Sequence, residues 1–214
     1  MSWLFAFMAT ITDLVTQKRD KERVSLFLDG EFAFGLALSV ASGLKIGQQL
    51  TAEEIDHLKS REQIEKAKQN ALIYVSVRPR SVYELQTHLQ RKSFEENVID
   101  TVVEFLLGLE LLDDTAFANY WIDQRETFRP RSRFALGKEL RQKGISREVI
   151  DNVLEDVDEL AAARRVVDKR SDRWANLPED AYREKMAGFL QRRGFSYEII
   201  REVLEETWQD QEET

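Results

Sequence analysis

The sequence predicts a mainly α-helical protein with three tandem three-helix repeats of about fifty residues, preceded by a small N-terminal β-hairpin module. Three observations lead to this fold class. The 214 residues include only three prolines and nine glycines, too few for a turn-dense β-sandwich. An arginine-rich motif recurs at a fixed spacing, and an Asp-Gly pair near the N-terminus separates two apolar runs. The predicted parts are the hairpin module with a short helix at 1–60 and repeats at 61–112, 113–160 and 161–214, the last with an acidic tail.

The N-terminal module is predicted from its turn. Asp29-Gly30 lies between VSLFL and EFAFGL, and both residues of such a two-residue loop can adopt a positive φ. Pairing across the loop places Phe27 opposite Phe32, which is expected to give the hairpin an apolar face for docking. Further on, the segment from Thr51 to Glu54 has the pattern of a capping box, which predicts a helix through about Leu58.

The first eight residues, MSWLFAFM, are apolar and lack the basic start of a signal peptide. We expect translation to begin at Met8. A short apolar arm docked on the fold is the alternative.

The repeat is marked by VRPRS at 77–81 and FRPRS at 128–132, in which Arg78 and Arg129 are 51 positions apart. Apolar positions recur in register through three copies, as in Leu89, Leu140 and Leu190, and in Val102, Val153 and Val203. A fixed period with a constant apolar phase predicts helical units that bury their faces on one another. Loss of the third repeat would then expose Ile150, Val153 and Leu154.

Capping residues predict where the helices of the repeats begin and end. In the second repeat, Asp113 or Asp114 precedes the first helix, and Ser132 or Pro130 begins the middle helix, which ends at Lys143-Gly144. Ser146 and Ser196 precede the last helices of the second and third repeats. The first repeat departs from this pattern, with Ser93 in place of the glycine and Glu95 in place of the capping serine.

The composition argues against catalytic and metal sites. The chain has no cysteine, and His57 and His88 are too few for an imidazole metal centre. No Gly-rich phosphate loop is present. We therefore expect no cofactor and no enzymatic activity; a pocket with converging carboxylates of perturbed pKa would reopen the enzyme interpretation. No apolar run approaches the ~20 residues that a transmembrane helix needs.

The charge is unevenly distributed. Of the net charge of −8, residues 1–60 carry −2, residues 61–145 carry +1 and residues 146–214 carry −7. This acidic balance argues against a protein that coats DNA and favours a protein partner. The aromatic residues Phe117, Trp121, Trp174 and Trp208 are expected to pack in the core rather than to stack on bases.

Three motifs in a fixed order resemble the RecX family, whose members modulate the RecA recombinase. The motifs are Arg78-Pro-Arg80-Ser81 with Glu84-Leu85, Leu112-Asp113-Asp114 with Phe117-Ala118 and Arg125, and Glu139-Leu140 with Lys143-Gly144-Ile145. The resemblance covers roughly residues 65–207. One departure is Arg91-Lys92-Ser93, where many members carry Lys-Gly.

The resemblance implies three tandem three-helix repeats and a cytoplasmic, non-enzymatic regulator. Such a protein binds RecA, lies along the groove of its nucleoprotein filament, and restrains filament growth and ATP-dependent strand exchange. We expect a monomer without cofactor, and contact with the DNA inside the filament is left open. Direct binding of single-stranded nucleic acid by a helical-repeat protein is the alternative function, and a steep salt dependence without RecA would favour it.

The repeated arginine motif carries the site hypothesis. It occurs twice at matching positions and is absent from the third repeat, so folding of the repeat does not require it. Arginine holds carboxylate or phosphate oxygens bidentately, which suits a binding surface. The alternative is that these side chains are only solvated. The predicted partner-binding residues are Arg78, Arg80, Arg125, Arg129, Arg131, Arg133 and Lys143.

Overall fold

The computed structural model describes residues 8–174 and 176–212, except the side chains of 208–212. The predicted apolar arm, the packing of Trp208 and the end of the acidic tail lie outside the described residues. The described chain forms two compact units. The N-terminal unit contains the residues up to Val77 together with Leu85–Leu109, and the C-terminal unit contains Arg78–Glu84 and the residues from Glu110 onward.

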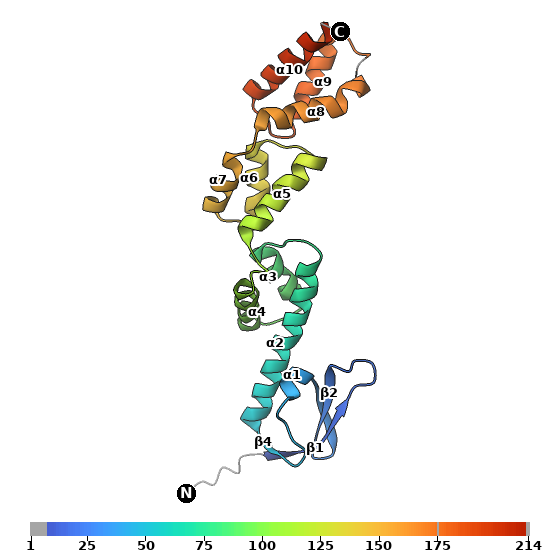
Figure 1. The fold of residues 1–214 in the computed structure, drawn as a ribbon, viewed down its shortest axis with the longest axis vertical. Helices are drawn as coiled ribbons and strands as arrows, with labels where there is room; N and C mark the ends of the chain where they lie inside the picture. Colours follow the sequence, from blue (N-terminus) through green and yellow to red (C-terminus); the bar gives the residue numbers. More distant parts are fainter. Residues whose placement is uncertain (1–7, 175, 213–214) are drawn as a thin grey trace. The chain divides into compact units, whose positions relative to one another are not determined.

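The predicted fold class is confirmed, because helices dominate the described chain and a small antiparallel sheet precedes them (Figure 1). The sheet has the strand order β3-β2-β1-β4. No helix among the described residues has the length and apolarity needed to cross a membrane. The elements of the N-terminal unit before α3 are β1 (Met8–Thr16), β2 (Arg23–Leu28), β3 (Glu31–Ala37), α1 (Leu38–Ala41), β4 (Gln49–Thr51) and α2 (Ala52–Ser76).

The predicted hairpin is formed by β2 and β3. Asp29 and Gly30 have φ values of 51° and 90°, as a two-residue loop of this kind requires. Phe27 pairs with Phe32 across the hairpin, and their ring centroids are 5.8 Å apart. Both the loop and the register are therefore confirmed.

The expectation that this phenylalanine pair docks the hairpin is wrong, because Phe32 is 60 % exposed. Side chains alternate between the two faces of a strand, and the buried face is the other one. It carries Val24, Leu26 and Leu36, which pack with Ile11 of β1.

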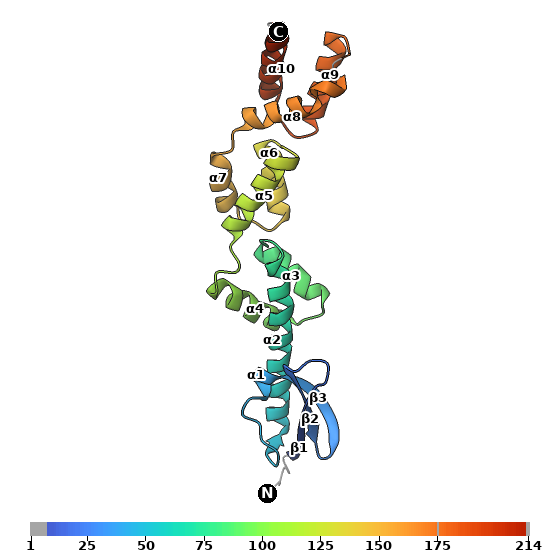
Figure 2. The ribbon, with the colours of Figure 1, turned by 45° about the vertical axis from the view of Figure 1, so that its right-hand side comes forward.

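Helix α2 begins with the predicted capping box. The Thr51 hydroxyl accepts a hydrogen bond from the Glu54 N–H, and the Glu54 carboxylate accepts one from the Thr51 N–H. The predicted end at Leu58 is wrong, since the helix continues to Ser76. No glycine or proline interrupts the chain between these positions, and the next proline is Pro79. Figures 1 and 2 show α2 running from the sheet to α4 within the N-terminal unit.

Glu62 links α2 to the sheet and is almost fully buried. Its carboxylate pairs with Arg23 of β2 and accepts a hydrogen bond of 2.6 Å from the N–H of Ala37 at the end of β3. A buried carboxylate with these partners fixes the helix against the strands.

Three helices make up each repeat, as predicted. The C-terminal part of α2 joins α3 and α4 in the first, and α5–α7 and α8–α10 form the second and third. The repeat boundaries themselves stay predictions. The helices are α3 (Val82–Arg91), α4 (Glu96–Gly108), α5 (Asp114–Phe128), α6 (Arg133–Gln142), α7 (Arg147–Glu155), α8 (Glu159–Trp174), α9 (Glu179–Gln191) and α10 (Tyr197–Glu212).

The helix caps follow the predicted residues and settle two open choices. Asp113, not Asp114, caps α5, and Ser132, not Pro130, caps α6. Ser146 and Ser196 accept hydrogen bonds from the first turns of α7 and α10. In the first repeat, Ser93 adopts a φ of 62° and Glu95 makes no side-chain cap, which confirms the predicted departure.

The second and third repeats have separate cores. Ile150, Val153 and Leu154 pack with Phe117 and the rest of the second repeat's own cluster. The third repeat has its own cluster around Val166, Met186, Leu190 and Val203, against which Trp174 packs. The expectation that the third repeat covers Ile150, Val153 and Leu154 is therefore wrong. Three amphipathic helices of a single repeat already enclose these side chains.

A truncated chain ending at Asp158 should therefore retain a folded second repeat. Truncation removes the ion pair of Arg165 with Glu126, the hydrogen bond from Lys169 to the Thr127 carbonyl and the hydrogen bond from the Ser132 N–H to the Arg193 carbonyl. Polar interactions of this kind are worth about 0.5–1.5 kcal/mol each, so we expect the second repeat to be destabilised by about 1.5–4.5 kcal/mol. Urea unfolding followed by circular dichroism measures this. Aggregation of the truncated chain, or loss of its helices, would contradict the model of separate cores.

Candidate functional site

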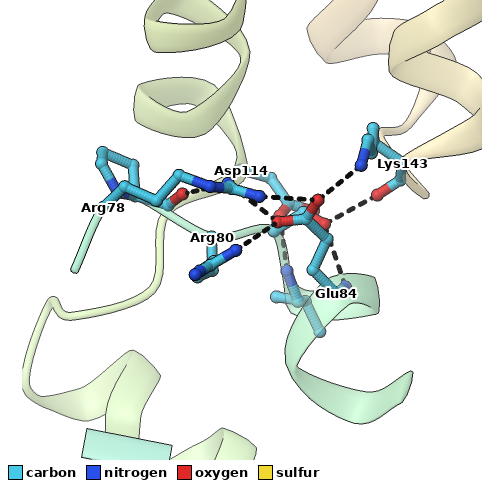
Figure 3. Close-up of polar contacts among 8 residues, drawn as sticks. Arg78, Arg80, Glu84, Asp114 and Lys143 are labelled. Atoms are coloured by element: carbon cyan, nitrogen blue, oxygen red, sulfur yellow. Dashed lines mark hydrogen bonds and ion pairs between the residues drawn. The ribbon is translucent and has the colours of Figure 1, made fainter. Parts of the chain in front are cut away.

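The first arginine segment, Arg78–Glu84, gathers positive charge around one carboxylate (Figure 3). Arg78 Nη1 lies 2.9 Å from Glu84 Oε2, and Lys143 Nζ lies 2.6 Å from Glu84 Oε1. Arg80 Nη1 is 3.9 Å from Glu84 Oε2. The Glu84 side chain is only 9 % exposed. The structure thus brings three of the seven predicted residues to a common partner.

The electrostatics of Glu84 follow from these contacts. Burial alone would raise the pKa of its carboxyl group, but the hydrogen bonds and charges of Arg78 and Lys143 outweigh burial and lower the pKa below its usual value. Glu84 is therefore ionised at neutral pH and is shared by Arg78, Arg80 and Lys143.

The motif serine of this segment has a structural role. The Ser81 hydroxyl is fully buried, accepts a hydrogen bond from the Glu84 N–H and donates one of 2.7 Å to the Lys143 carbonyl. Asp114 accepts a hydrogen bond from the Val82 N–H. Burial raises the pKa of Asp114, and the neighbouring charge of Asp113 adds to this, whereas the bond from Val82 opposes it. The segment is thereby held against the second repeat within the C-terminal unit.

The second arginine segment, Arg129–Ala135, lies 51 positions later and repeats this arrangement. Ser132 is fully buried, its hydroxyl accepts a hydrogen bond from the Ala135 N–H, and its own N–H donates to the Arg193 carbonyl. Gly194 adopts a φ of 90° beside it, and a Cβ there would lie 2.5 Å from the Ser132 hydroxyl oxygen. Each motif serine thus binds the loop that ends the middle helix of the following repeat.

Glu139 of α6 collects a second group of the predicted residues. Its carboxylate oxygens lie 2.7 Å from Arg125 Nε and 2.8 Å from Arg131 Nε. The same carboxylate accepts a hydrogen bond from the indole N–H of Trp121. Lys143 Nζ lies 4.9 Å from the centroid of the Trp121 ring, so Trp121 connects this group to the one around Glu84.

The remaining two predicted residues behave differently. Arg133 donates from Nε to the Val157 carbonyl at 2.7 Å. Arg129 is exposed and has no ion pair with any described residue. The sequence alone assigns no role to Glu84 or Glu139, although both stand in the quoted motifs. It also gives no sign of three arginines of the third repeat, Arg170, Arg192 and Arg193, which lie around Phe189.

The expected packing of the aromatic residues is confirmed where the side chains are described. Phe117 is fully buried, Trp121 packs on the second repeat's core, and Trp174 contacts Phe189 edge-on. Among the described residues, no cluster of three or more histidine, aspartate or glutamate side chains could hold a metal ion.

Family models match four stretches that together span most of the chain. The Regulatory protein RecX N-terminal domain matches residues 9–51. The first, second and third three-helix domains of RecX match residues 67–106, 113–154 and 156–204. A regulatory protein RecX of Bacillus licheniformis is 31% identical over 205 residues, covering 94% of this chain and 78% of that protein. This chain belongs to the RecX family.

Other RecX proteins agree with this assignment. The regulatory protein RecX of Clostridium botulinum is 29% identical over 206 residues, which cover 93% of this chain and 96% of the relative. A crystal structure of regulatory protein RecX matches with a TM-score of 0.72 and 27% identity, covering 91% of this chain and 98% of that one. The RecX structure from Lactobacillus salivarius has a TM-score of 0.60 at 21% identity over 68% of this chain and 97% of that chain, which supports the fold.

The RecX domains place the two arginine segments in different repeats. The first segment and Glu84 fall in the first three-helix domain, whereas the second segment, Glu139 and Lys143 fall in the second. The arginines around Phe189 fall in the third. The seven predicted residues thus fall in the first and second RecX domains, and the third domain contributes only the arginines around Phe189.

Proposed function

We propose that this chain regulates the RecA recombinase in DNA repair and recombination by binding RecA and its nucleoprotein filament. In this role it inhibits filament growth, ATP hydrolysis and strand exchange. The observation that carries the proposal is the family membership along nearly the whole chain, with relatives that are named regulatory proteins. The protein acts as a cytoplasmic monomer, by recognition rather than by catalysis.

The two arginine segments support a binding surface for an acidic partner. Glu84 is shared by Arg78, Arg80 and Lys143, and Glu139 is shared by Arg125 and Arg131. Arg129 adds a further charge that no described carboxylate offsets. Ion pairing within the chain also holds the guanidinium groups in place, which lowers the entropy cost when a partner binds. The surface therefore combines one exposed, unpaired arginine with cationic donors that are held in place.

Assays of RecA from the same organism test the proposal directly. ATPase and strand-exchange rates are measured with increasing amounts of the protein. We expect both rates to fall as the protein approaches a stoichiometric ratio to RecA. Unchanged rates at that ratio would remove the proposed function, and an increase would reverse its sign.

Arg129→Glu should weaken inhibition with little effect on folding. Arg129 is exposed and unpaired among the described residues, so we expect the unfolding free energy to change by less than ~0.5 kcal/mol. The reversed charge repels an acidic partner, and we expect roughly tenfold more protein to be needed for half-inhibition of the ATPase. Arg147→Glu is the matched control, since Arg147 is an exposed arginine of α7 outside the predicted surface. Equal inhibition by the two variants would show that Arg129 is merely solvated.

A further inference from the structure

A cluster of arginines lies beside the second arginine segment, and among the described residues only one of its members, Arg131, forms an ion pair, with Glu139. We define the arginine cluster as Arg129, Arg131, Arg170, Arg192 and Arg193. The guanidinium carbons of Arg193 and Arg170 lie 4.1 and 4.7 Å from the centroid of the Phe189 ring, and that of Arg192 lies 6.0 Å away. Charge from α8 and from the end of α9 is therefore concentrated around one aromatic ring, and Arg129 and Arg131 are close enough to act electrostatically on Arg193.

The two arginine segments differ at one position that decides their charge. Glu84 of the first corresponds to Ala135 of the second at the repeat spacing of 51, and Lys143 corresponds to Arg193 at a spacing of 50. Where Lys143 meets Glu84, Arg193 meets no carboxylate. Among the described residues, no ion pair neutralises Arg193, Arg170 or Arg192, and the buried Nε–H of Arg193 has no acceptor.

The electrostatics of Arg193 agree with this geometry. Burial lowers the pKa of its guanidinium group, and the charges of Arg131, Arg170, Arg129 and Arg192 lower it further. Arginine nevertheless stays charged in proteins. The folded protein thus holds several like charges together at a cost, which an anion bound from outside would relieve.

We propose that the arginine cluster binds the phosphodiester backbone of a nucleic acid strand, whose phosphate oxygens take the place that Glu84 occupies at the first segment. Guanidinium groups bind phosphate oxygens in a planar, bidentate manner. A strand supplies anions in a continuous row, which suits Arg129, Arg170, Arg192 and Arg193 better than a single carboxylate does. The inference does not depend on RecA, because the binding needs no second protein.

The same contacts indicate that the site reads the backbone and not the bases. Arg170 and Arg193 lie over the Phe189 ring, and Trp174 meets it edge-on at 5.8 Å between ring centroids. Phe189 is therefore already occupied and cannot serve as a stacking platform. Backbone contacts carry no sequence information, so we expect binding without sequence preference.

Fluorescence anisotropy of the full-length protein with a labelled oligothymidylate, without RecA and at low salt, tests the proposal. Arg170→Gln/Arg192→Gln removes two charges that pair with no described carboxylate, and we expect binding to weaken at least tenfold. The matched control is Arg147→Gln/Arg201→Gln, which removes two exposed arginines elsewhere and should change binding less than threefold. Affinity should also fall steeply with salt.

A second variant introduces a carboxylate of the chain itself into the arginine cluster. Ala135→Glu places a carboxylate at the position of Glu84 and should abolish oligonucleotide binding while thermal unfolding stays cooperative. Three results would overturn the proposal: absence of binding by the unaltered protein, equal losses in the two double variants, or unchanged binding in Ala135→Glu. Stronger binding of a labelled polyglutamate than of the oligonucleotide would also overturn it and assign the cluster to an acidic protein. RecA inhibition is measured separately, so failure here and failure of the proposed function are distinguishable.

Discussion

Replacing Gly144 with alanine should destabilise the C-terminal unit by about 2–5 kcal/mol. Gly144 has a φ of 79°, which costs an L-residue about 1–2 kcal/mol. A Cβ at this position would also lie 2.3 Å from the Tyr83 Cβ, at the contact where Ser81 binds the Lys143 carbonyl. Overlap in a packed contact adds about 1–3 kcal/mol. Urea unfolding of the full chain, followed by tryptophan fluorescence, measures the effect.

Gly47→Ala provides the matched control for backbone strain. Gly47 has a similar φ of 86°, and a Cβ there would meet no atom within 4 Å. We expect only the conformational cost of about 1–2 kcal/mol from this variant. If Gly144→Ala lowers the unfolding free energy no more than Gly47→Ala does, Tyr83 moves away freely. The close packing of the first arginine segment against Gly144 would then contribute nothing to stability.

Local rules of sequence account for most of the fold. The Asp29-Gly30 loop, the capping box at Thr51 and the capping serines depend on neighbours within a few residues, and these predictions are confirmed. The predicted end of α2 at Leu58 comes too early in the chain, because it places the end of the helix where the repeat pattern begins. No glycine or proline lies between Leu58 and Ser76 to end the helix there. The predicted buried face of the hairpin is wrong because it is based on one aromatic pair. The alternating apolar residues Val24, Leu26 and Leu36 indicate the opposite face, which is the one that is buried.

The candidate site is predictable only in part. Repetition of the arginine motif points to Arg78 and Arg129, but the role of the motif serines depends on contacts 62 residues apart in the chain, such as that of Ser81 with Lys143. The unneutralised charge at Arg193 depends on Ala135 standing where Glu84 stands in the earlier copy. This difference is visible in the aligned repeats, but its consequence appears only once the loops are seen in contact.

Glu84→Ala should destabilise the C-terminal unit by about 2–3 kcal/mol. The change leaves Arg78 and Lys143 without their common acceptor at a site that is largely shielded from solvent. Each hydrogen bond to a charged group contributes about 1.5–3 kcal/mol to stability. Arg78 and Lys143 are partly exposed, which reduces the contribution of each bond, so the loss of both is expected to cost about 2–3 kcal/mol in total. Thermal and urea unfolding of the variant measure the change. Arg125 and Arg131 should keep their pairing with Glu139, so the second group serves as an internal reference.

The pH dependence of the unfolding free energy separates the contribution of the Glu84 charge from that of its size and hydrogen bonding. Glu84→Gln keeps the size of the side chain and one acceptor oxygen but lacks the charge, so we expect a loss of about 1 kcal/mol, smaller than that of alanine. Because the pKa of Glu84 is lowered on folding, its ionic contribution is complete above the unfolded value of about 4.3 and disappears as the pH falls through the lower folded value. The difference in unfolding free energy between the unaltered protein and Glu84→Gln should therefore be constant above about pH 5 and shrink under more acidic conditions. A difference that stays constant down to about pH 3 would mean that the Glu84 charge contributes nothing, and that the positive residues around it are held by packing alone.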